Sequence, residues 1–367
     1  MRAGKDWVSA LRNNTLTPIE SFTTQAAYCE ANGAPVTAAL CRALASAVDK
    51  TTRTGAAVLA WSGHPVHDAL PLRLASAVHG LWRAGNAPTL ASLFGGGGDA
   101  ESNAAVLRGV LLRHDAELLP WLDGPPQTNE VGRSAQLMTG LLEIAARHGP
   151  CIELLEIGSS AGLNLMLDRF RIELADVVTG PHDAPLTLTP EWCGPPPPAV
   201  AINILTTRGV DVAPVDATTE LGARRLLAYV WPDHPARVTR LTFALTMLRA
   251  APPRVDTDDA VAWLAARLAE PQAAGVTRVL MHSIVWQYLG KARQQRITAA
   301  MEAAGALATA QRPLGWVRVE ANRTVHKHEI TLRSWPGFRK SILLGHAHPH
   351  GFWVERLAEP VLGYEMP

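Results

Sequence analysis

The stretch from Glu153 to Leu165 reads ELLEIGSSAGLNL and decides the fold of the second half of the chain. The apolar residues from Ile152 to Ile157 have the composition of a buried strand. Gly158 to Gly162 then turns the chain into a helical segment that starts near Leu163. Glycine permits positive φ or the close approach of a ligand to the backbone, and a helix N-terminus offers free amides. The stretch therefore predicts a cofactor loop, with a plain strand-to-helix turn as the alternative.

The composition excludes several classes of protein. With 367 residues, 47% of them hydrophobic and 18% charged, the chain is long enough for about two globular domains. The 34 Lys and Arg residues almost balance the 33 Asp and Glu residues, so no overall field attracts nucleic acid or an acidic membrane. The N-terminus lacks an apolar signal core, and no run approaches the ~18 to 20 apolar residues of a membrane span. We expect a cytoplasmic protein with a small-molecule substrate, no nucleic acid and no membrane partner; the oligomeric state cannot be read from these features.

The first third of the chain has the pattern of helices. From Ser21 to about Ala116 the sequence is rich in Ala and Leu, and apolar residues recur there at intervals of three and four. The glycine run at 95–98 is not followed by the lysine and hydroxyl of a phosphate loop, which favours an interhelical connection. Two prolines end this part at Asp123–Pro126. We therefore predict a helical N-terminal domain at residues 1–125.

The remainder, residues 126–367, alternates strands with helices. Predicted strands cover 152–157, 200–212, 276–282, 316–320, 329–333 and 341–344, with a further short strand near 254–255. Predicted helices cover 134–147, 163–168, 219–230, 260–268 and 291–304. This alternation is typical of a parallel sheet covered on both faces, and the last strands could add an antiparallel hairpin. An inserted hairpin is expected near 170–198. The fold class is α/β, with a mostly parallel Rossmann-like sheet.

The loop at Gly158 resembles the first motif of methyltransferases that use S-adenosyl-L-methionine (SAM). The shared form is Glu156-x-Gly158-x-x-x-Gly162, and Ser160 stands where a middle glycine is usual. A dinucleotide-binding loop fits less well, because it would need glycine at both Ser160 and Leu163. The resemblance implies a methyltransferase-like Rossmann domain whose cofactor contacts include Glu156, Gly158, Ser159, Ser160, Ala161, Gly162 and Asn164.

A wider resemblance covers nearly the whole chain. The segments PQTNEVGRS (126–134), LEIGSSAGLNL (155–165), RGVDVAPVD (208–216), VWP (230–232) and HPHG (348–351) are similar to those of a bacterial family of unknown function, DUF2332. These motifs are specific, but the family name carries an expectation about the fold and none about a substrate.

Acidic residues follow later strands and are candidates for the cofactor site. An acid at the second strand end of methyltransferase-like folds accepts hydrogen bonds from both ribose hydroxyls, which favours Asp211, with Asp216 as the rival. Either could instead cap the helix that starts near Thr219. Asp259, with Asp258 beside it, follows the third strand, where a side chain commonly meets the adenine amino group; helix capping is the alternative there too.

Polar residues precede the helix that leads into the first strand. Asn129 and Arg133, together with Gln127 and Glu130, should lie over the carboxyl edge of the sheet, where open α/β sheets bind ligands. An arginine fork matches a carboxylate such as the methionine end of SAM. The alternative is a hydrogen-bond network that fixes the linker between domains.

Candidate catalytic residues follow the fourth and fifth strands. His282 and Tyr288 are candidate bases, Trp286 could form a wall or contact the sulfonium, and Glu320 ends the next strand at the same edge. A packed strand end with satisfied polar groups is the alternative. We expect the acceptor pocket between these residues and a terminal hairpin that carries His348 and His350, roofed by the helical domain.

The sequence favours no metal site. The four cysteines are widely spaced and form no CxxC pair, so we expect reduced packing residues: Cys29, Cys41, Cys151 and Cys193. His346, His348 and His350 could share one face of an extended segment, but Pro349 and Gly351 indicate a turn.

These features predict a SAM-binding protein, and as its activity a methyltransferase (a transferase) that acts on a small molecule. An Asn-Pro-Pro-Tyr-type motif is absent, which argues against amino groups of bases and glutamine as substrates. Two alternatives remain. One is a non-catalytic SAM- or nucleotide-binding module, and the other is a metal-dependent hydrolase that uses His346, His348 and His350.

Overall fold

A computed structural model describes residues 16–322, 325, 327–338 and 340–364. It divides into two compact units, which we treat separately. The first unit comprises the chain up to Thr128 together with Thr219–Thr239, and the second comprises Asn129–Thr218 and the chain from Arg240 onward. No helix in the described ranges is long and apolar enough to cross a membrane.

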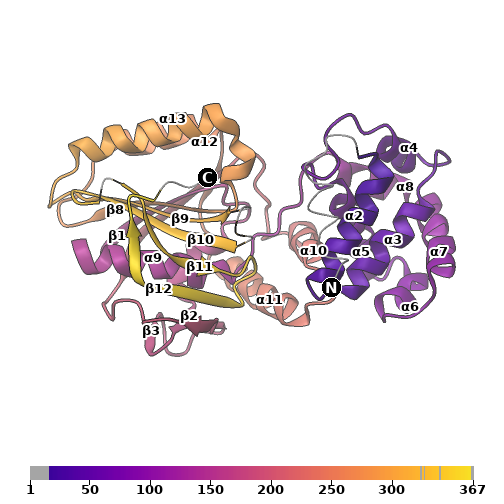
Figure 1. The fold of residues 1–367 in the computed structure, drawn as a ribbon, viewed down its shortest axis with the longest axis horizontal. Helices are drawn as coiled ribbons and strands as arrows, with labels where there is room; N and C mark the ends of the chain where they lie inside the picture. The colour runs from indigo at the N-terminus through magenta and orange to yellow at the C-terminus, as the bar shows by residue number, and fades with distance from the viewer. Residues whose placement is uncertain (1–15, 323–324, 326, 339, 365–367) are drawn as a thin grey trace. The chain divides into compact units, whose positions relative to one another are not determined.

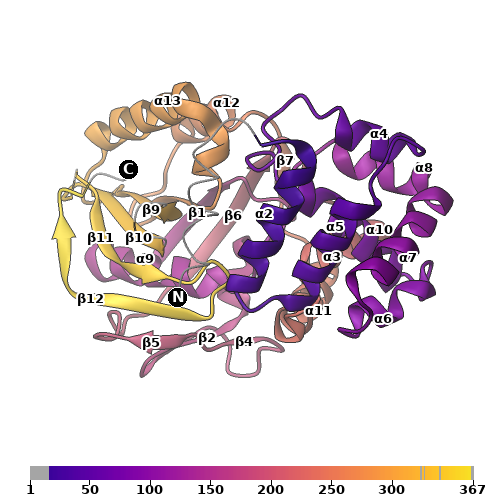
Figure 2. The ribbon, with the colours of Figure 1, turned by 45° about the vertical axis from the view of Figure 1, so that its right-hand side comes forward.

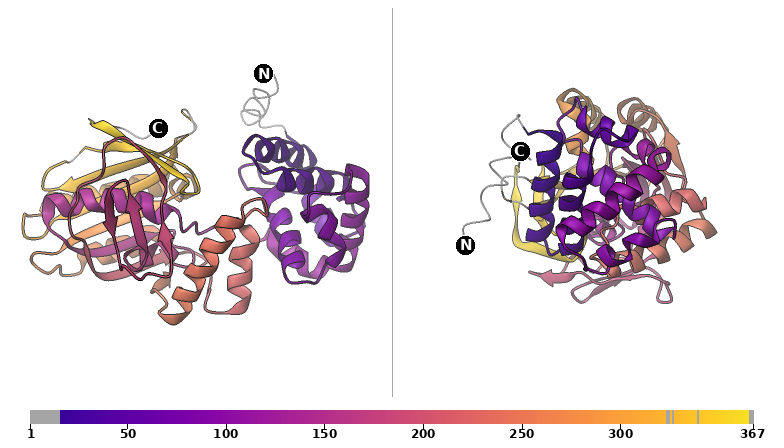
Figure 3. Two further views of the ribbon diagram at one scale, coloured as in Figure 1. Left: turned by 90° about the horizontal axis from the view of Figure 1, so that it is seen from below. Right: turned by 90° about the vertical axis from the view of Figure 1, so that its right-hand side faces the viewer.

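The described residues of the first unit form helices around an apolar core (Figure 3, right). The α-helices are α2 (Pro18–Ala31), α3 (Pro35–Ala47), α4 (Arg53–Leu59), α5 (Leu70–Arg83), α6 (Ala91–Phe94), α7 (Ala100–Arg113), α8 (Asp115–Leu118) and α10 (Glu220–Tyr229), with 3-10 turns η1 (Pro88–Leu90) and η2 (Leu119–Leu122). Local capping defines their starts: the Thr17 hydroxyl accepts from the Glu20 amide, and Glu20 accepts from the Thr17 amide in return.

The helix α10 joins the first unit although it begins about one hundred residues after the end of α8 in sequence. The Asp233 carboxylate accepts hydrogen bonds from the amides of Val36 (2.7 Å) and Thr37 (3.0 Å) at the start of α3. His79 of α5 bonds through Nδ1 to the carbonyl of Ala228 at 2.9 Å. These contacts explain why a segment that follows a strand of the second unit packs with the N-terminal helices. The helix α11 (Pro235–Ala250) then leads back into the second unit.

A nine-stranded sheet forms the centre of the second unit, in the order β5-β12-β11-β10-β9-β8-β1-β6-β7 (Figures 1 and 2). The strands are β1 (Cys151–Ile157), β5 (Glu191–Cys193), β6 (Asn203–Asp211), β7 (Val255–Thr257), β8 (Thr277–Ser283), β9 (Leu314–Asn322), β10 (Lys327–Trp335), β11 (Ile342–Ala347) and β12 (Trp353–Leu362). Five neighbours, β7, β6, β1, β8 and β9, are parallel. Their order in the chain corresponds to 3-2-1-4-5, which is Rossmann-like.

The antiparallel part of the sheet follows the parallel part. The strands β9, β10, β11 and β12 pair antiparallel in succession, and β5 adds to β12 in parallel. The predicted insertion near 170–198 forms a separate three-stranded sheet of β2 (Arg171–Leu174), β3 (Val177–Thr179) and β4 (Thr187–Leu188), and it also supplies β5. The insertion is therefore more than one hairpin.

Helices cover both faces of the large sheet (Figure 1). The helix α9 (Arg133–His148) lies on one face, where Gly140 packs so closely on Val317 that an added Cβ would be 2.5 Å from its Cγ1. The helices α12 (Ala260–Ala269) and α13 (Trp286–Leu307) cover the other face, where Met301 packs in one core cluster with Trp316. Because side chains alternate along a strand, neighbours on β9 face α9 and α13 in turn.

The segment after the Gly158 loop differs from the expected α-helix. Leu163–Arg169 forms the 3-10 helix η3, and the amide of Leu163 donates to Oδ1 of Asn129 at 3.1 Å. Because the first amide of this seven-residue 3-10 helix is already paired, the segment offers a ligand fewer free N–H groups than the N-terminus of an α-helix would.

Candidate functional site

The carboxyl ends of the parallel strands bring the predicted site residues to one edge of the sheet. The strands β1, β6, β7, β8 and β9 end at this edge, and β11, which runs parallel to them, ends there at Ala347. The order of the strands reverses between β1 and β8, and ligands of open α/β sheets bind at such a switch point. The loop at Gly158 lies at this point.

The loop has the backbone conformation that its glycines predicted. The φ angles are +67° at Gly158, +54° at Ser160 and +79° at Gly162. The space beside the glycines is filled, however: an added Cβ would lie 2.4 Å from Cγ2 of Val285 at Gly158, and 2.7 Å from Cγ of Pro253 at Gly162. This packing accounts for glycine at both positions, and the approach of a ligand to their backbone stays a prediction.

The carboxylate of Asp211 holds the same loop. Its Oδ2 accepts from the amide of Ser160 and its Oδ1 from the amide of Ala213, each at 2.9 Å. Asp216 is exposed and accepts from the amide of Thr218 at 3.1 Å. The cap of α10 is Thr219, so the suggested capping roles of both aspartates are corrected. Asp211 therefore holds the loop through the amide of Ser160.

Glu156 is a buried carboxyl group at the end of β1. Its side chain is 2% exposed, and Oε2 has no hydrogen-bond partner in the described part of the chain. The pKa of Glu156 is raised to about 8, mainly by burial and also by the nearby Asp211 carboxylate, against the opposing effects of Ser159, Arg133 and Asn164. Glu156 is therefore protonated at neutral pH and can donate a hydrogen bond.

The segment before α9 is tied to the loop by hydrogen bonds within the second unit. Asn129, at φ +33°, accepts from the amide of Leu163, and the hydroxyl of Ser134 donates to Oδ1 of Asn164 at 2.8 Å. All four residues are buried. Asn129 and Asn164 thus position η3, which is a structural role beside the predicted contact with a cofactor.

Arg133, the first residue of α9, contacts the terminal hairpin. Its Nε donates to the carbonyl of Pro349 at 3.0 Å, and Nε2 of Gln136 donates to the carbonyl of His348 at 2.6 Å. Burial lowers the pKa of His328 to about 3, and the positive charge of Arg133 contributes. The hairpin therefore lies at the start of α9, together with the predicted cofactor residues.

The histidines of the terminal segment do not assemble a three-ligand set. Nδ1 of His346 lies 4.0 Å from Glu355, while the ring centroids of His348 and His350 are 5.5 Å apart. Among the described residues no group of three His, Cys, Asp or Glu side chains is placed to hold a metal ion.

His282 and Glu320 form a buried pair at the ends of β8 and β9. Nδ1 of His282 lies 2.6 Å from Oε1 of Glu320, which also accepts from the amide of Val285 at 3.2 Å. Burial lowers the pKa of His282, and Glu320 opposes this effect. With the Nδ1 proton held by Glu320, the second nitrogen, Nε2, has its lone pair available, and it has no partner among the described residues. The pair has the arrangement of a base with an orienting carboxylate.

Aromatic rings cover this pair. The rings of His282 and Trp286 stack with centroids 5.2 Å apart and an angle of 12°, and Trp286 meets Trp316 edge to face. Tyr288 is 61% exposed in the first turn of α13, ahead of a break at Gly290. Trp286 therefore lies where a wall was predicted, whereas Tyr288 faces solvent.

The predicted site residues divide between the two faces of the sheet. Leu155 and Leu280 belong to the core cluster beneath α12 and α13. By alternation Glu156 points to the α9 face, and His282 points to the α13 face. The expected pocket between His282 and the hairpin of His348 is corrected accordingly, because His348 contacts α9. The expected roof formed by the helical domain stays a prediction.

Asp259 is the N-terminal cap of α12, which was the alternative to a contact with adenine. It caps α12 by accepting from the amide of Val261 at 3.0 Å, and it pairs with Arg293 at 2.9 Å. Burial and these contacts act in opposite directions on its pKa, which is lowered overall.

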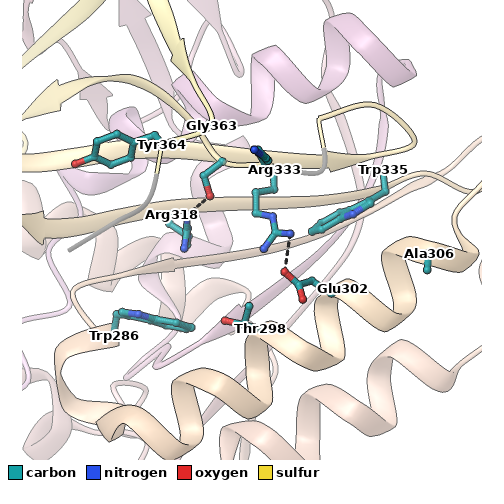
Figure 4. A pocket seen from close by; sticks show the side chains of 11 residues that line it. Trp286, Thr298, Glu302, Ala306, Arg318, Arg333, Trp335, Gly363 and Tyr364 are labelled. Atoms are coloured by element: carbon teal, nitrogen blue, oxygen red, sulfur yellow. Dashed lines mark hydrogen bonds and ion pairs between the residues drawn. The ribbon is translucent and has the colours of Figure 1, made fainter.

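A cavity of about 580 Å³ lies on the α13 face, and the sequence motifs did not predict it (Figure 4). It is lined by Trp286, Thr298, Glu302, Ala306, Arg318, Arg333, Trp335, Lys340, Ser341, Gly363 and Tyr364. One signal was present in the sequence. The run Trp316-Val-Arg-Val-Glu320 alternates polar or aromatic residues with valines, and such alternation places Trp316, Arg318 and Glu320 on one face.

The comparison with protein families now identifies the chain. The model of the family described as "Uncharacterized protein conserved in bacteria (DUF2332)" matches residues 19–356. The chain belongs to the DUF2332 family. No curated protein and no solved structure gives a significant match. The family resemblance read from the sequence motifs is thus confirmed, and the DUF2332 description names no activity.

Proposed function

We propose that this DUF2332 protein binds SAM at the switch point between β1 and β8 and transfers its methyl group to a small molecule. The observation that carries the proposal is the loop at Gly158 to Gly162, which follows the first strand of a 3-2-1-4-5 parallel order with three residues at positive φ. Backbone of this shape at a switch point is where α/β folds of this order bind nucleotides.

The residues of the second unit would hold the cofactor as follows. Asp211 uses one lone pair of each oxygen on the loop amides, and a carboxylate has about four acceptor positions, so it can also accept from a ribose diol. Arg133 lies at the start of α9 with a guanidinium suited to a carboxylate. Protonated Glu156 adds a donor beside them. We assign no cofactor contact to Asp259, whose carboxylate caps α12 and pairs with Arg293.

His282 is the proposed base. Bound SAM supplies an electrophilic methyl group, so the protein has to align the acceptor and remove its proton where it carries one. Nε2 of His282 takes the proton, while Glu320 keeps Nδ1–H in place and stabilises the imidazolium that results. His282 is fully buried, so this step requires a movement of the segment from Ile284 to Gly290, whose two end residues have positive φ.

A second candidate function is a non-catalytic SAM- or nucleotide-binding module. The complete burial of His282 favours it, because the proposed base is not open to an acceptor. The two candidates differ in turnover: both predict binding of SAM, and only the methyltransferase predicts formation of S-adenosylhomocysteine in the presence of an acceptor.

The test of the shared claim is calorimetric titration of the full chain with SAM, S-adenosylhomocysteine and NAD in parallel. We expect both adenosyl compounds to bind with one-to-one stoichiometry, and NAD to bind more weakly. Binding of NAD in preference to SAM would overturn the proposal and support a dinucleotide site.

A further inference from the structure

The cavity on the α13 face is enclosed by α13, by the strands β9 and β10, and by the segments at 340–341 and 363–364 of the second unit. Thr298 and Glu302 line it from α13, Arg318 from β9, and Arg333 from β10 (Figure 4). Its volume of about 580 Å³ is within the range of roughly 300 to 1,000 Å³ that is typical of small-molecule sites.

Arg318 places a buried positive charge against this cavity. Arg318 is 6% exposed, and its guanidinium donates hydrogen bonds to two hydroxyls. Its Nε donates to Thr331 at 3.1 Å, and a terminal nitrogen donates to Ser341 at 2.7 Å. Within the described ranges no carboxylate forms an ion pair with Arg318. Burial, with the nearby charge of Arg333, lowers the pKa of Arg318 to about 10, and the charges of Glu320 and Glu329 oppose this effect without forming an ion pair. A buried guanidinium without a carboxylate partner is costly, and an anion in the cavity would offset that cost.

The other charged groups of the cavity leave it positive. Arg333 forms an ion pair with Glu302 at 2.9 Å, so these two charges compensate. Lys340 is exposed at the cavity and has no ion-pair partner among the residues that the structure describes. Glu302 is the acidic residue among those that line the cavity. Arg318 and Lys340 therefore supply the uncompensated charge.

Aromatic rings form part of the wall. Trp286 and Trp335 both line the cavity, with Tyr364 from the C-terminal segment, as Figure 4 shows. The guanidinium of Arg333 lies 4.8 Å from the ring centroid of Trp335, in a cation–π contact. Such rings offer flat apolar surface beside the charged groups, and this combination suits a ligand that has both features.

We infer that this cavity binds a small molecule that carries a phosphate or carboxylate group on a flat ring, with the anionic group on Arg318 and Lys340. Arg318 can offer its remaining N–H groups, and two charge-assisted contacts would fix the orientation of the anion. The ring would lie against Trp286 or Trp335. The lining of this site shares no residue with the loop from Gly158 to Gly162, and its link to the proposed function is Trp286, which stacks on His282.

The experiment is calorimetric titration of the full chain with phenyl phosphate, benzoate, inorganic phosphate and phenol. We expect phenyl phosphate and benzoate to bind, inorganic phosphate to bind more weakly, and phenol to show no saturable binding. Arg318→Gln should weaken the binding of phenyl phosphate about ten- to a hundredfold, because it removes charge-assisted hydrogen bonds. The comparison of phenyl phosphate with benzoate shows whether the site prefers a phosphate or a carboxylate group.

Two further variants keep the test decisive if Arg318→Gln is poorly folded. Lys340→Ala removes an exposed charge at the cavity and should weaken phenyl phosphate binding several-fold. Lys291→Ala removes an exposed lysine at the start of α13 outside the cavity, and should leave binding unchanged. Equal affinity in wild type, Arg318→Gln and Lys340→Ala would overturn the inference. Absence of binding to wild type at about 10 mM phenyl phosphate would also overturn it, because a dissociation constant above that value is too weak for a specific site. SAM affinity should be the same in all three variants, so failure here is distinguishable from failure of the proposed function.

Discussion

Nδ1 of His282 lies 2.6 Å from Oε1 of Glu320, and both side chains are almost completely buried between the sheet and α13. A hydrogen bond of this length, in surroundings from which water is excluded, fixes the orientation of the imidazole. The same carboxylate accepts from the amide of Val285, in the segment that packs on Gly158. Glu320 thus connects the candidate base to the candidate cofactor loop.

Removal of the Glu320 carboxylate should destabilise the protein strongly. Glu320→Ala leaves the Nδ1 proton of His282 and the amide of Val285 without their acceptor, and breaking a buried pair in this way costs about 3 to 5 kcal/mol. Glu320→Gln keeps an acceptor oxygen and should cost less. Urea denaturation measures both free energies of unfolding. Glu359→Ala, which truncates an exposed glutamate of β12, is the control and should change the free energy by less than about 0.5 kcal/mol. Equal losses in Glu320→Ala and Glu359→Ala would contradict a structural pair.

Glu156 should make the stability depend on pH. Its pKa is about 8 in the folded chain and near 4.5 in the unfolded chain, so the folded state binds more protons between these values. The free energy of unfolding should therefore fall as the pH rises from about 4.5 to 8. Glu156→Gln removes the titrating group and with it this pH dependence. At pH 8.5 the variant should be more stable than wild type by up to a few kcal/mol, because each unit of pKa difference corresponds to about 1.4 kcal/mol. At pH 4.5 the two should be nearly equal.

The measurement is chemical denaturation of wild type and Glu156→Gln across this pH range. Glu359→Gln, an exposed glutamate in the same unit, serves as control and should follow the wild-type curve. Parallel curves for wild type and Glu156→Gln would show that Glu156 does not titrate in this window.

Asp211 should affect both the loop and the binding of SAM. Asp211→Ala removes the acceptor of the Ser160 and Ala213 amides, and we expect a loss in SAM affinity of about ten- to a hundredfold. Asp216→Ala, at an exposed turn on the same segment, is the matched control. Calorimetry gives the affinities and thermal denaturation shows whether each variant is folded. A larger effect of Asp216→Ala would assign the ribose contact to the other aspartate.

Asp233 should stabilise the first unit. Its carboxylate accepts from two amides and from the hydroxyl of Thr37 at the start of α3, where unpaired N–H groups and the helix dipole favour a negative charge. Asp233→Ala should lower the free energy of unfolding by about 2 to 3 kcal/mol, and Asp233→Asn by less. A change below about 0.5 kcal/mol in Asp233→Ala would contradict this role.

The parallel strands were predictable from the sequence, because a buried strand has a local signature. The apolar run of β1 and the mainly apolar β8 each predicted a strand near its observed bounds. The strand β12 was expected only as part of a terminal hairpin and was given no bounds: it is largely exposed toward its end and contains Pro360, so its sequence lacks a buried pattern. Its pairing with β11 depends on a partner rather than on its own composition.

Long-range contacts explain what the sequence did not reveal. The position of α10 in the first unit depends on Asp233, which bonds residues nearly two hundred positions earlier in the chain. The side chain of Val285 packs against Gly158. Glycine at this position therefore fits either close packing by a neighbouring side chain or close approach of a ligand, and the sequence alone does not distinguish the two. Arg318 was not singled out because its environment comes from β9, β10, the loop before β11 and α13, which are distant in sequence.

The central claim is that the loop at Gly158 binds SAM, and its most direct test is calorimetric titration of the wild-type chain with S-adenosylhomocysteine, repeated on Asp211→Ala and Asp216→Ala. The account predicts saturable one-to-one binding to wild type and Asp216→Ala, with affinity at least about tenfold weaker in Asp211→Ala. Absence of binding to folded wild-type protein, or equal affinity in wild type and Asp211→Ala, would contradict it.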